Sequence, residues 1–407
     1  MWLRLKLAFR NTFRNSRRTT LNVLMIAGGV CTMLLFEGFA HRMVLGLRET
    51  TIKTQTGHLQ IAKTSYWKKT AKRPKDNLLP NYRNWIQEIR KTPHVSYAAG
   101  RLTFYSLLTY GEKSLSAQGV SFDPQAEKSR QQAFKFVKGT GLNPKKKFQV
   151  AIGIGLATKL KIKPGKQVTL LGQTYDGVVN ALDMEVSGIF QTAITEFDDN
   201  SFIVPLEAAQ TLLDTQGVEQ IVVGLDSTSS TTFVKNDLNR RLGAEVAGVQ
   251  IRPWYWLAPL YNQVADFNRV QNKVFKFIIL SLILLSILNT IGMSIAERTG
   301  EIGTVRAMGE SPWKLVFQFL LEGIILGATG ALVGAILGSL VAFGVNSMKI
   351  PIMLPGANSA YPIKIDLLWE AVKQSTLLAI LASGVAALLP AIRASRLNIV
   401  ESLKRFV

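Results

Sequence analysis

The sequence holds few of the residues that build catalytic or metal centres. It has one cysteine, Cys31, and three histidines, His41, His58 and His94, in 407 residues. A single cysteine excludes a disulfide framework within the chain, and the histidines show no metal-ligand spacing. The acidic run "EFDD" at 196–199 is a weak calcium candidate and is more simply a loop. We therefore predict no catalytic residue, no metal site and no cofactor site.

Nucleotide-binding motifs are incomplete. The Gly-Lys pair at 165–166 has Leu160 where a P-loop has its first glycine, and Gln167 where a P-loop has Ser or Thr. The segment "GIGLAT" at 153–158 lacks the third glycine of a dinucleotide fingerprint. We expect that this chain is not an enzyme by itself.

Apolar residues are concentrated in four long runs. A bilayer core of ~30 Å requires roughly 20 apolar residues in a helix. Four segments meet this length, and we predict them as transmembrane helices 1 to 4: residues 21–45, 273–296, 313–346 and 367–393. The first run is longer than the core of a cleaved signal peptide, so we expect it to be retained.

Basic residues at the helix ends set the expected orientation. Arginines and lysines precede the first run without any acid and follow the last run against Glu401 alone. Both termini are therefore predicted to be cytoplasmic. Residues 1–20 are amphipathic and predict an interfacial helix on the cytoplasmic surface, and residues 394–407 a cytoplasmic tail. The block 46–272 and a short loop at 347–366 then lie outside.

The block 46–272 has the pattern of an α+β domain. Strands are predicted at 57–67, 95–111, 113–122, 184–190, 202–204 and 220–225, with helices between them. A weak boundary between two subdomains is expected near 140–150, and helical stalks at 46–55 and 257–273. The expected fold is an α-helical membrane protein with four transmembrane helices. A large α+β extracytoplasmic domain is inserted between helices 1 and 2.

The net charge of +21 is divided between the membrane flanks and the outer block. The block carries 29 Lys and Arg against 19 Asp and Glu, concentrated in "KKTAKRPK" (68–75) and "NPKKKF" (143–148). Nucleic acid is a poor explanation for charge on that side. These basic patches are either solvated loops or an attraction for anionic lipid headgroups or an acidic partner.

The polar segment "ERTGEIGTVRAMGESPW" (297–313) lies between two membrane-length runs. Its pattern predicts a short helix over 297–309, ended by a glycine C-cap, with a new helix beginning at Pro312. Three apolar side chains at helical spacing favour docking on a soluble partner over a plain loop. The candidate coupling residues are Glu297, Arg298, Glu301, Ile302, Val305, Arg306, Met308 and Gly309.

Glycines recur along the third run at small-x-x-x-small spacings, which let helix backbones approach closely. They are Gly323, Gly327, Gly330, Gly334 and Gly338. They either pack against the fourth run of the same chain or form a contact between two copies of the chain.

Two long segments resemble a known family. "ERTGEIGTVRAMGESPWKLVFQFLLEGIILGATGALVGAILG" (297–338) is similar to the hallmark of FtsX/MacB-type permeases of ABC transporters. "LPAIRASRLNIVESLKRF" (389–406) is similar to the family's closing segment. Segments of the outer block, such as "GHLQIAKTSYW" (57–67), look most like the lipoprotein-releasing branch, LolC and LolE. The usual "GD" of this branch is "GK" at 165–166.

The resemblance implies partners and a mechanism. Two permeases, identical or homologous, would pair in the bacterial inner membrane. Each would rest on an ABC ATPase subunit that holds the ATP and Mg²⁺. ATPase closure would push the 297–309 helices and move the outer domains, a mechanotransmission that expels or extracts a cargo, with membrane lipids and a possible periplasmic carrier or adaptor as further partners.

The cargo is open at this point. Lipoproteins are the first candidate, and acyl chains would need an apolar groove. The candidate groove residues are Met33, Leu34, Phe36, Ile279, Leu282 and Ile283. The alternatives are a MacB-like efflux permease for antibiotics or peptides, and an FtsX-like transmitter that activates a cell-wall hydrolase.

Overall fold

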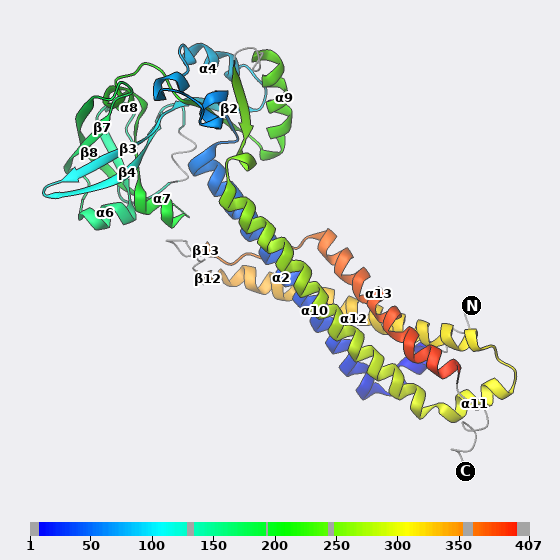
Figure 1. Cartoon of the computed structure of the whole chain (residues 1–407). Helices are drawn as coiled ribbons and strands as arrows, with labels where there is room; N and C mark the ends of the chain where they lie inside the picture. Colours follow the sequence, from blue (N-terminus) through cyan, green and yellow to red (C-terminus); the bar gives the residue numbers. More distant parts are fainter. Residues whose placement is uncertain (1–7, 128–133, 193, 243–247, 353–360, 397–407) are drawn as a thin grey trace. The chain divides into compact units, whose positions relative to one another are not determined.

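The computed structural model describes residues 8–127, 134–192, 194–242, 248–352 and 361–396 (Figure 1). The chain divides into two compact units. A helical unit comprises residues 1–44, 264–351 and 362–407, and an α+β unit comprises 45–263 and 352–361. Parts of three predictions lie outside the described residues: the start of the interfacial helix (1–7), the middle of the loop after the third run (353–360), and the tail from 397.

Among the residues that the structure describes, four helices are long and apolar enough to cross a membrane. They are α2 (Ser16–Thr51), α10 (Pro259–Glu297), α12 (Pro312–Met348) and α13 (Trp369–Ser395). The prediction of four such helices is confirmed. Helices α2 and α10 extend past the predicted spans into the segments expected to form helical stalks, because the polar residues beside the apolar runs continue the same helix.

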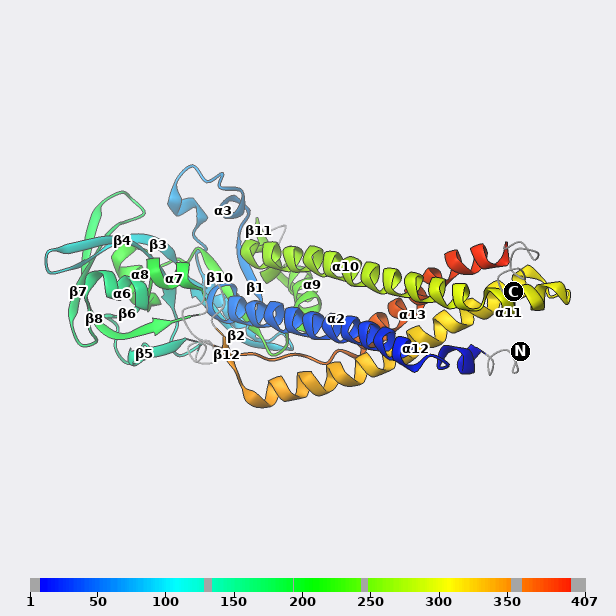
Figure 2. The same cartoon turned by 90° about the horizontal axis from the view of Figure 1, so that it is seen from below.

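Isoleucines spaced four residues apart on α10 form one side of the core of the helical unit. Ile279, Ile283, Ile287, Ile291 and Ile295 are all buried, as expected for side chains that lie above one another on a single helix face. Two of them pack at Gly29 of α2, and both views show α2 and α10 side by side (Figures 1 and 2). Other positions of α10 instead expose large apolar side chains, among them Phe277, Leu282 and Leu285.

The α+β unit contains two main sheets. The first is antiparallel, with strand order β11-β1-β10-β2. Its strands are β1 (Leu59–Lys63), β2 (Val95–Arg101), β10 (Gln220–Leu225) and β11 (Val249–Pro253). Helices α3 (Thr64–Lys68), α4 (Tyr82–Arg90) and α9 (Thr231–Leu242) accompany it. Short 3-10 helices are η2 (Pro74–Asn77), η3 (Thr228–Ser230) and η4 (Trp254–Trp256).

The second sheet has seven strands in the order β5-β8-β6-β9-β4-β3-β7. Strand β8 also pairs with β7, so six of these strands close into a ring. The strands are β3 (Thr103–Tyr110), β4 (Lys113–Phe122), β5 (Lys135–Gly139), β6 (Gln149–Gly153), β7 (Gln167–Gln173), β8 (Val179–Gln191) and β9 (Ser201–Pro205). Helices α6 (Ile154–Leu160), α7 (Thr195–Asn200) and α8 (Leu206–Leu213) pack with it. A two-stranded pair, β12 (Pro351–Ile352) with β13 (Tyr361–Pro362), follows α12.

The expected subdomain boundary near 140–150 is wrong. Residues on both sides of it belong to the seven-stranded sheet. The seven-stranded sheet is instead an insertion between β2 and β10, which are neighbours in the first sheet. The predicted strand 95–111 is accordingly two strands in different sheets, separated at Leu102. The hairpin of β3 and β4 around Gly111 is confirmed, and Gly111 has the positive φ that such a turn requires.

Three local expectations also need correction or detail. The strand predicted over 57–67 stops at Lys63, and α3 follows. The acidic run at 196–199 lies in α7 and not in a loop; Asp198 is buried and accepts bonds from the backbone and hydroxyl of Thr192. The basic patches form ion pairs with the same unit, for example Lys75 with Asp176 at 2.5 Å and Lys146 with Glu185 at 2.9 Å.

Candidate functional site

The segment between the second and third long helices is a short helix with defined ends. Helix α10 ends at Glu297, and α11 covers Thr299–Ala307. Gly309 follows with φ +90°, a conformation that glycine adopts without steric cost. Extended Ser311 then leads into Pro312 at the first turn of α12. The predicted helix is therefore present but shorter, because Glu297 completes α10 and Arg298 forms the junction.

The apolar side chains predicted to face a partner point to different environments. Ile302 is 5% exposed and belongs to the core of the helical unit. Met308 is 75% exposed, and Val305 is at the border of exposure. Ile302 is therefore wrong as a docking residue: α11 turns Gly300, Ile302 and Gly303 toward its own bundle. Periodicity alone cannot distinguish a side that faces the bundle from one that faces a partner.

The turn between α11 and α12 exposes further apolar side chains that sequence reasoning missed. Trp313 is 75% exposed and Phe317 is also exposed. We call Val305, Met308, Trp313 and Phe317 the turn residues. The signal available in the sequence was Trp313 itself, a large aromatic side chain directly after the proline that begins α12.

Most charged coupling candidates bind their own chain. Arg14 pairs with Glu301 at 3.1 Å, and Arg18 pairs with Glu297 at 2.6 Å. The buried pair Arg298–Glu322 joins the α10–α11 junction to α12 at 3.3 Å, and Glu322 also accepts a bond of 3.2 Å from the Asn11 side-chain amide. Arg306 lies in the last turn of α11. The N-terminal segment is thus tied to both ends of the junction, which stiffens α11 against the bundle.

A cavity of about 290 Å³ lies among these pairs. Its charged lining residues are Arg14, Arg18, Arg298, Glu297 and Glu322. Both glutamates form ion pairs, Glu297 with Arg18 and Glu322 with Arg298. The formal charges of these five side chains sum to +1, because each glutamate offsets one arginine. Within the described ranges, no group of three or more His, Cys, Asp or Glu side chains is placed to hold a metal ion.

The glycine row of α12 faces two different helices of the same chain. A Cβ on Gly323 or Gly327 would lie 2.7 or 2.6 Å from Ala387 or Ser383 of α13. A Cβ on Gly330, Gly334 or Gly338 would meet α2. The alternative in which the glycines pack only against the fourth run is therefore incomplete, because the last three glycines of the row pack against the first run. In this arrangement the glycines face helices of the same chain, which is the intrachain alternative.

Gly334→Ala is expected to destabilise the helical unit. The new Cβ would lie 2.6 Å from the carbonyl oxygen of Ala27, and backbone cannot yield as a flexible side chain does. We expect a loss of about 1–3 kcal/mol, read as a lower melting temperature of the full chain in detergent. Gly344→Ala is the matched control, because nothing lies within 4 Å of its Cβ. Equal melting temperatures for the two variants would contradict this packing.

The candidate cargo groove is largely filled by the chain itself. Met33, Leu34, Ile279 and Ile283 are buried in the helical core. Phe36 packs on Phe275 with ring centroids 4.5 Å apart, and only Leu282 of this set is exposed, at 54%. These six residues therefore do not form one open groove in this chain. As at Ile302, the sequence does not distinguish buried from exposed positions of these helices, because both carry similar apolar side chains.

The described architecture is that of a membrane protein with four spanning helices and a large α+β unit. Two protein-family models match the sequence. The MacB-like periplasmic core domain matches residues 19–241, more than half of the chain, and the FtsX-like permease C-terminal domain matches residues 273–399. The chain belongs to this family of FtsX- and MacB-type permeases.

The sequence is similar, at low identity, to transport proteins from several bacteria. The lipoprotein-releasing system transmembrane protein LolE of Haemophilus influenzae is 22% identical over 66% of this chain and 65% of its own length. The corresponding LolC of Xylella fastidiosa is 25% identical over 63% of this chain and 65% of its own length. The macrolide export ATP-binding/permease protein MacB of Nitrobacter winogradskyi is 26% identical over 61% of this chain and 40% of its own length. The chain thus matches just under two thirds of the first two relatives.

Among solved structures, the periplasmic region of MacB from Actinobacillus actinomycetemcomitans is similar with a TM-score of 0.37 and 12% identity. The match covers 53% of this chain and 96% of that one.

Proposed function

We propose that this chain is the permease subunit of an ABC transporter. A separate ABC ATPase subunit, acting as a dimer, binds ATP and Mg²⁺, and its closure pushes the turn residues. The helices α10 and α12 carry that push, and the α+β unit moves on the outer face of the bacterial inner membrane. In this proposal the unit is inserted between the first and second spans, and both termini are cytoplasmic.

One observation carries the proposal. Helix α10 is continuous from Pro259 to Glu297 and is followed directly by α11, whose attachment to the bundle is stiffened by the Arg298–Glu322 pair. An uninterrupted helix of 39 residues transmits displacement along its axis. The exposed Met308 and Trp313 beside it offer a partner large apolar side chains of the kind enriched at interfaces.

The test is an ATPase assay with and without a partner. Purified alone, the chain should hydrolyse no ATP. Purified from its native membrane under mild detergent, it should bring with it an ABC ATPase, identified by mass spectrometry, whose activity depends on the chain. Robust ATP hydrolysis by the isolated chain, or an ATPase that never accompanies it, would refute the proposal.

Lipoproteins are the proposed cargo, supported by the similarity to LolE and LolC. We place a permease pair around a central space and expect exposed side chains of α10 to line it, Leu282 among them. Burial of each acyl CH₂ there gains about 0.8 kcal/mol. The similarity to MacB supports drug or peptide efflux as the second candidate.

A photo-crosslinker at Leu282 is expected to capture a lipoprotein or lipid, and ATP with the partner subunit should reduce that capture. A crosslinker at the adjacent Ile283, which is 2% exposed, should capture only other parts of this chain. Capture of soluble drugs or peptides at Leu282 would support the efflux candidate instead. No capture beside an intact ATPase complex would leave a signal transmitter as the better account.

A further inference from the structure

We call α2 the shaft helix. It is not followed directly by a loop. Its last turn passes into the π-helix η1 (Ile52–Thr56), a conformation that is rare and frequent at functional sites. The amide of Gly57 closes the π-turn on the carbonyl of Ile52 at 2.8 Å. A Cβ on Gly57 would meet Val222 of β10 at 2.4 Å, so the end of the π-helix lies directly against the four-stranded sheet.

His58 follows immediately and is buried between the shaft and this sheet. Its backbone amide donates to Val223, and its carbonyl accepts from Trp254. Its side chain makes a third bond: the backbone amide of Leu225 donates to Nδ1 at 3.0 Å. Since a backbone amide can only donate, Nδ1 must be the nitrogen without a proton, and we assign the proton to Nε2.

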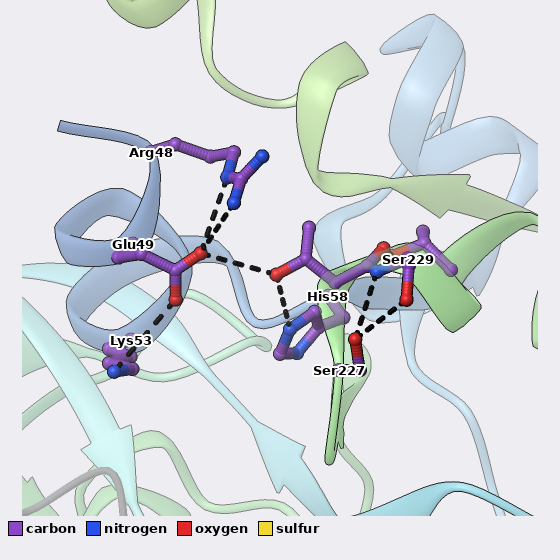
Figure 3. Close-up of polar contacts among 8 residues, drawn as sticks. Arg48, Glu49, Lys53, His58, Ser227 and Ser229 are labelled. Carbon is purple, nitrogen blue, oxygen red and sulfur yellow. Dashed lines mark hydrogen bonds and ion pairs between the residues drawn. The ribbon is translucent and has the colours of Figure 1, made fainter. Parts of the chain in front are cut away.

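The assigned Nε2 proton faces a chain of polar side chains that ends on the shaft (Figure 3). Nε2 lies 3.3 Å from the hydroxyl oxygen of Thr228. That hydroxyl lies 3.4 Å from a carboxylate oxygen of Glu49, on the last turn of α2. These two links are long, and the bond from Leu225 is the short one. The direction of donation is nevertheless uniform, from the strand end through the imidazole to the carboxylate.

Burial disfavours a charged His58, and the surrounding charged groups act in both directions. Burial lowers its pKa, and Lys53 and Arg48 lower it further, against the opposite effects of Glu49 and Asp226. Both carboxylates are already engaged. Glu49 pairs with Arg48 at 3.0 Å and with Lys53 at 3.8 Å, and Asp226 pairs with His94 at 3.0 Å.

We propose that neutral His58 is a positioning residue that holds the end of the shaft helix on the four-stranded sheet, and that protonation releases this hold. That this attachment passes movement of α2 to the sheet rests on the proposed function. The attachment itself does not depend on that function. A protonated ring would present an N–H to the N–H of Leu225, so the strand end would lose its acceptor and the imidazole could no longer bridge strand and shaft.

The sign of the pH effect follows from the lowered pKa. The folded protein binds the His58 proton less readily than the unfolded chain, whose histidine titrates near 6.5. The stabilisation is therefore complete above about pH 6.5. It is lost progressively as the pH falls below that value toward the folded pKa, and acid should loosen this joint before it unfolds the rest.

The test is hydrogen–deuterium exchange of the full chain in lipid nanodiscs at about pH 8 and about pH 5, corrected for intrinsic exchange rates. Protection of the peptide containing Leu225 should be lower at the lower pH, because the folded protein holds His58 neutral and protonation removes the acceptor of the Leu225 amide. A peptide from β9 in the other sheet serves as the internal reference and should not change.

Three variants isolate the imidazole. His58→Asn keeps an acceptor for the Leu225 amide without a titrating group, so its protection should not depend on pH. His58→Leu should be unprotected at both pH values. Thr228→Val should loosen the amides of 45–51 while Leu225 stays protected at the higher pH. Identical pH profiles for wild type and His58→Asn, or full protection in His58→Leu, would overturn the assignment. The experiment needs no ATPase, so its outcome is independent of the proposed function.

Discussion

Met308→Asp is expected to detach the ATPase subunit without unfolding the chain. Met308 is 75% exposed, so the free chain tolerates a carboxylate there. In the complex the same carboxylate would lie unpaired in an apolar groove, which costs several kcal/mol. Because about 1.4 kcal/mol is a factor of ten in affinity, the complex should weaken by about a hundredfold or more, measured as ATPase retained on the immobilised permease.

The control for this prediction is the same substitution at the opposite end of α12. Met348 is 73% exposed, and Met348→Asp should leave ATPase binding unchanged. Ile302→Asp is expected to behave differently from both. Its side chain is buried in the bundle, so the variant should lose thermal stability before any question of docking arises. Full ATPase binding and coupling in Met308→Asp would show that the turn residues are not the docking surface.

Arg101→Met is expected to give the largest loss of stability in the α+β unit. Arg101 is 3% exposed and donates to the fully buried Glu127 at 2.7 Å. It also donates to the carbonyl of Gln55 in the π-helix at 2.9 Å. One side chain on β2 therefore contacts both the end of the shaft helix and Glu127, in the segment that follows β4. Removing one partner of a buried pair costs about 3–5 kcal/mol.

The pH dependence of that loss has a defined sign. Burial raises the pKa of Glu127 to about 7, and Arg101 opposes the rise. Without Arg101 the pKa rises further, so near pH 6 the buried carboxyl is neutral at little cost. Near pH 8 the Glu127 carboxyl must either ionise without a partner or stay protonated at a pH where a free carboxyl is ionised, and both cost free energy. The destabilisation should therefore be larger near pH 8 than near pH 6.

Thermal unfolding of the full chain, followed by tryptophan fluorescence, measures this effect. Arg101→Met combined with Glu127→Met should recover much of the loss, because apolar replacement of both members of a buried pair is often neutral. Lys146→Ala, which removes the exposed pair with Glu185, should cost about 1 kcal/mol or less. If Arg101→Met costs no more than Lys146→Ala, the pair is not a structural joint.

The sequence predicts those features that depend on neighbouring residues. The long apolar helices follow from length and composition, because a bilayer imposes its requirement on each segment separately. The turn at Gly111 and the turn at Gly309, which follows α11, depend on the conformational freedom of glycine.

Features that depend on distant residues are not predictable in this way. The insertion of the seven-stranded sheet requires β2 to pair with β10, more than one hundred residues later in the chain. The burial of Ile302 and Ile283, against the exposure of Met308 and Leu282, depends on which helix lies opposite each side chain. Similar apolar side chains serve both environments, so periodicity finds the helix and cannot assign its faces.

The central claim is that ATP bound by a partner subunit moves the α+β unit of this chain. The direct measurement is a spin-label distance in the reconstituted complex, with Cys31→Ser as background and Asn239→Cys on the exposed surface of α9 as the labelled site. The account predicts that the distance between the two permease copies changes when ATP is added and returns after hydrolysis. Met308→Asp should abolish the change. An unchanged distance distribution while the ATPase turns over at its full rate would contradict the account.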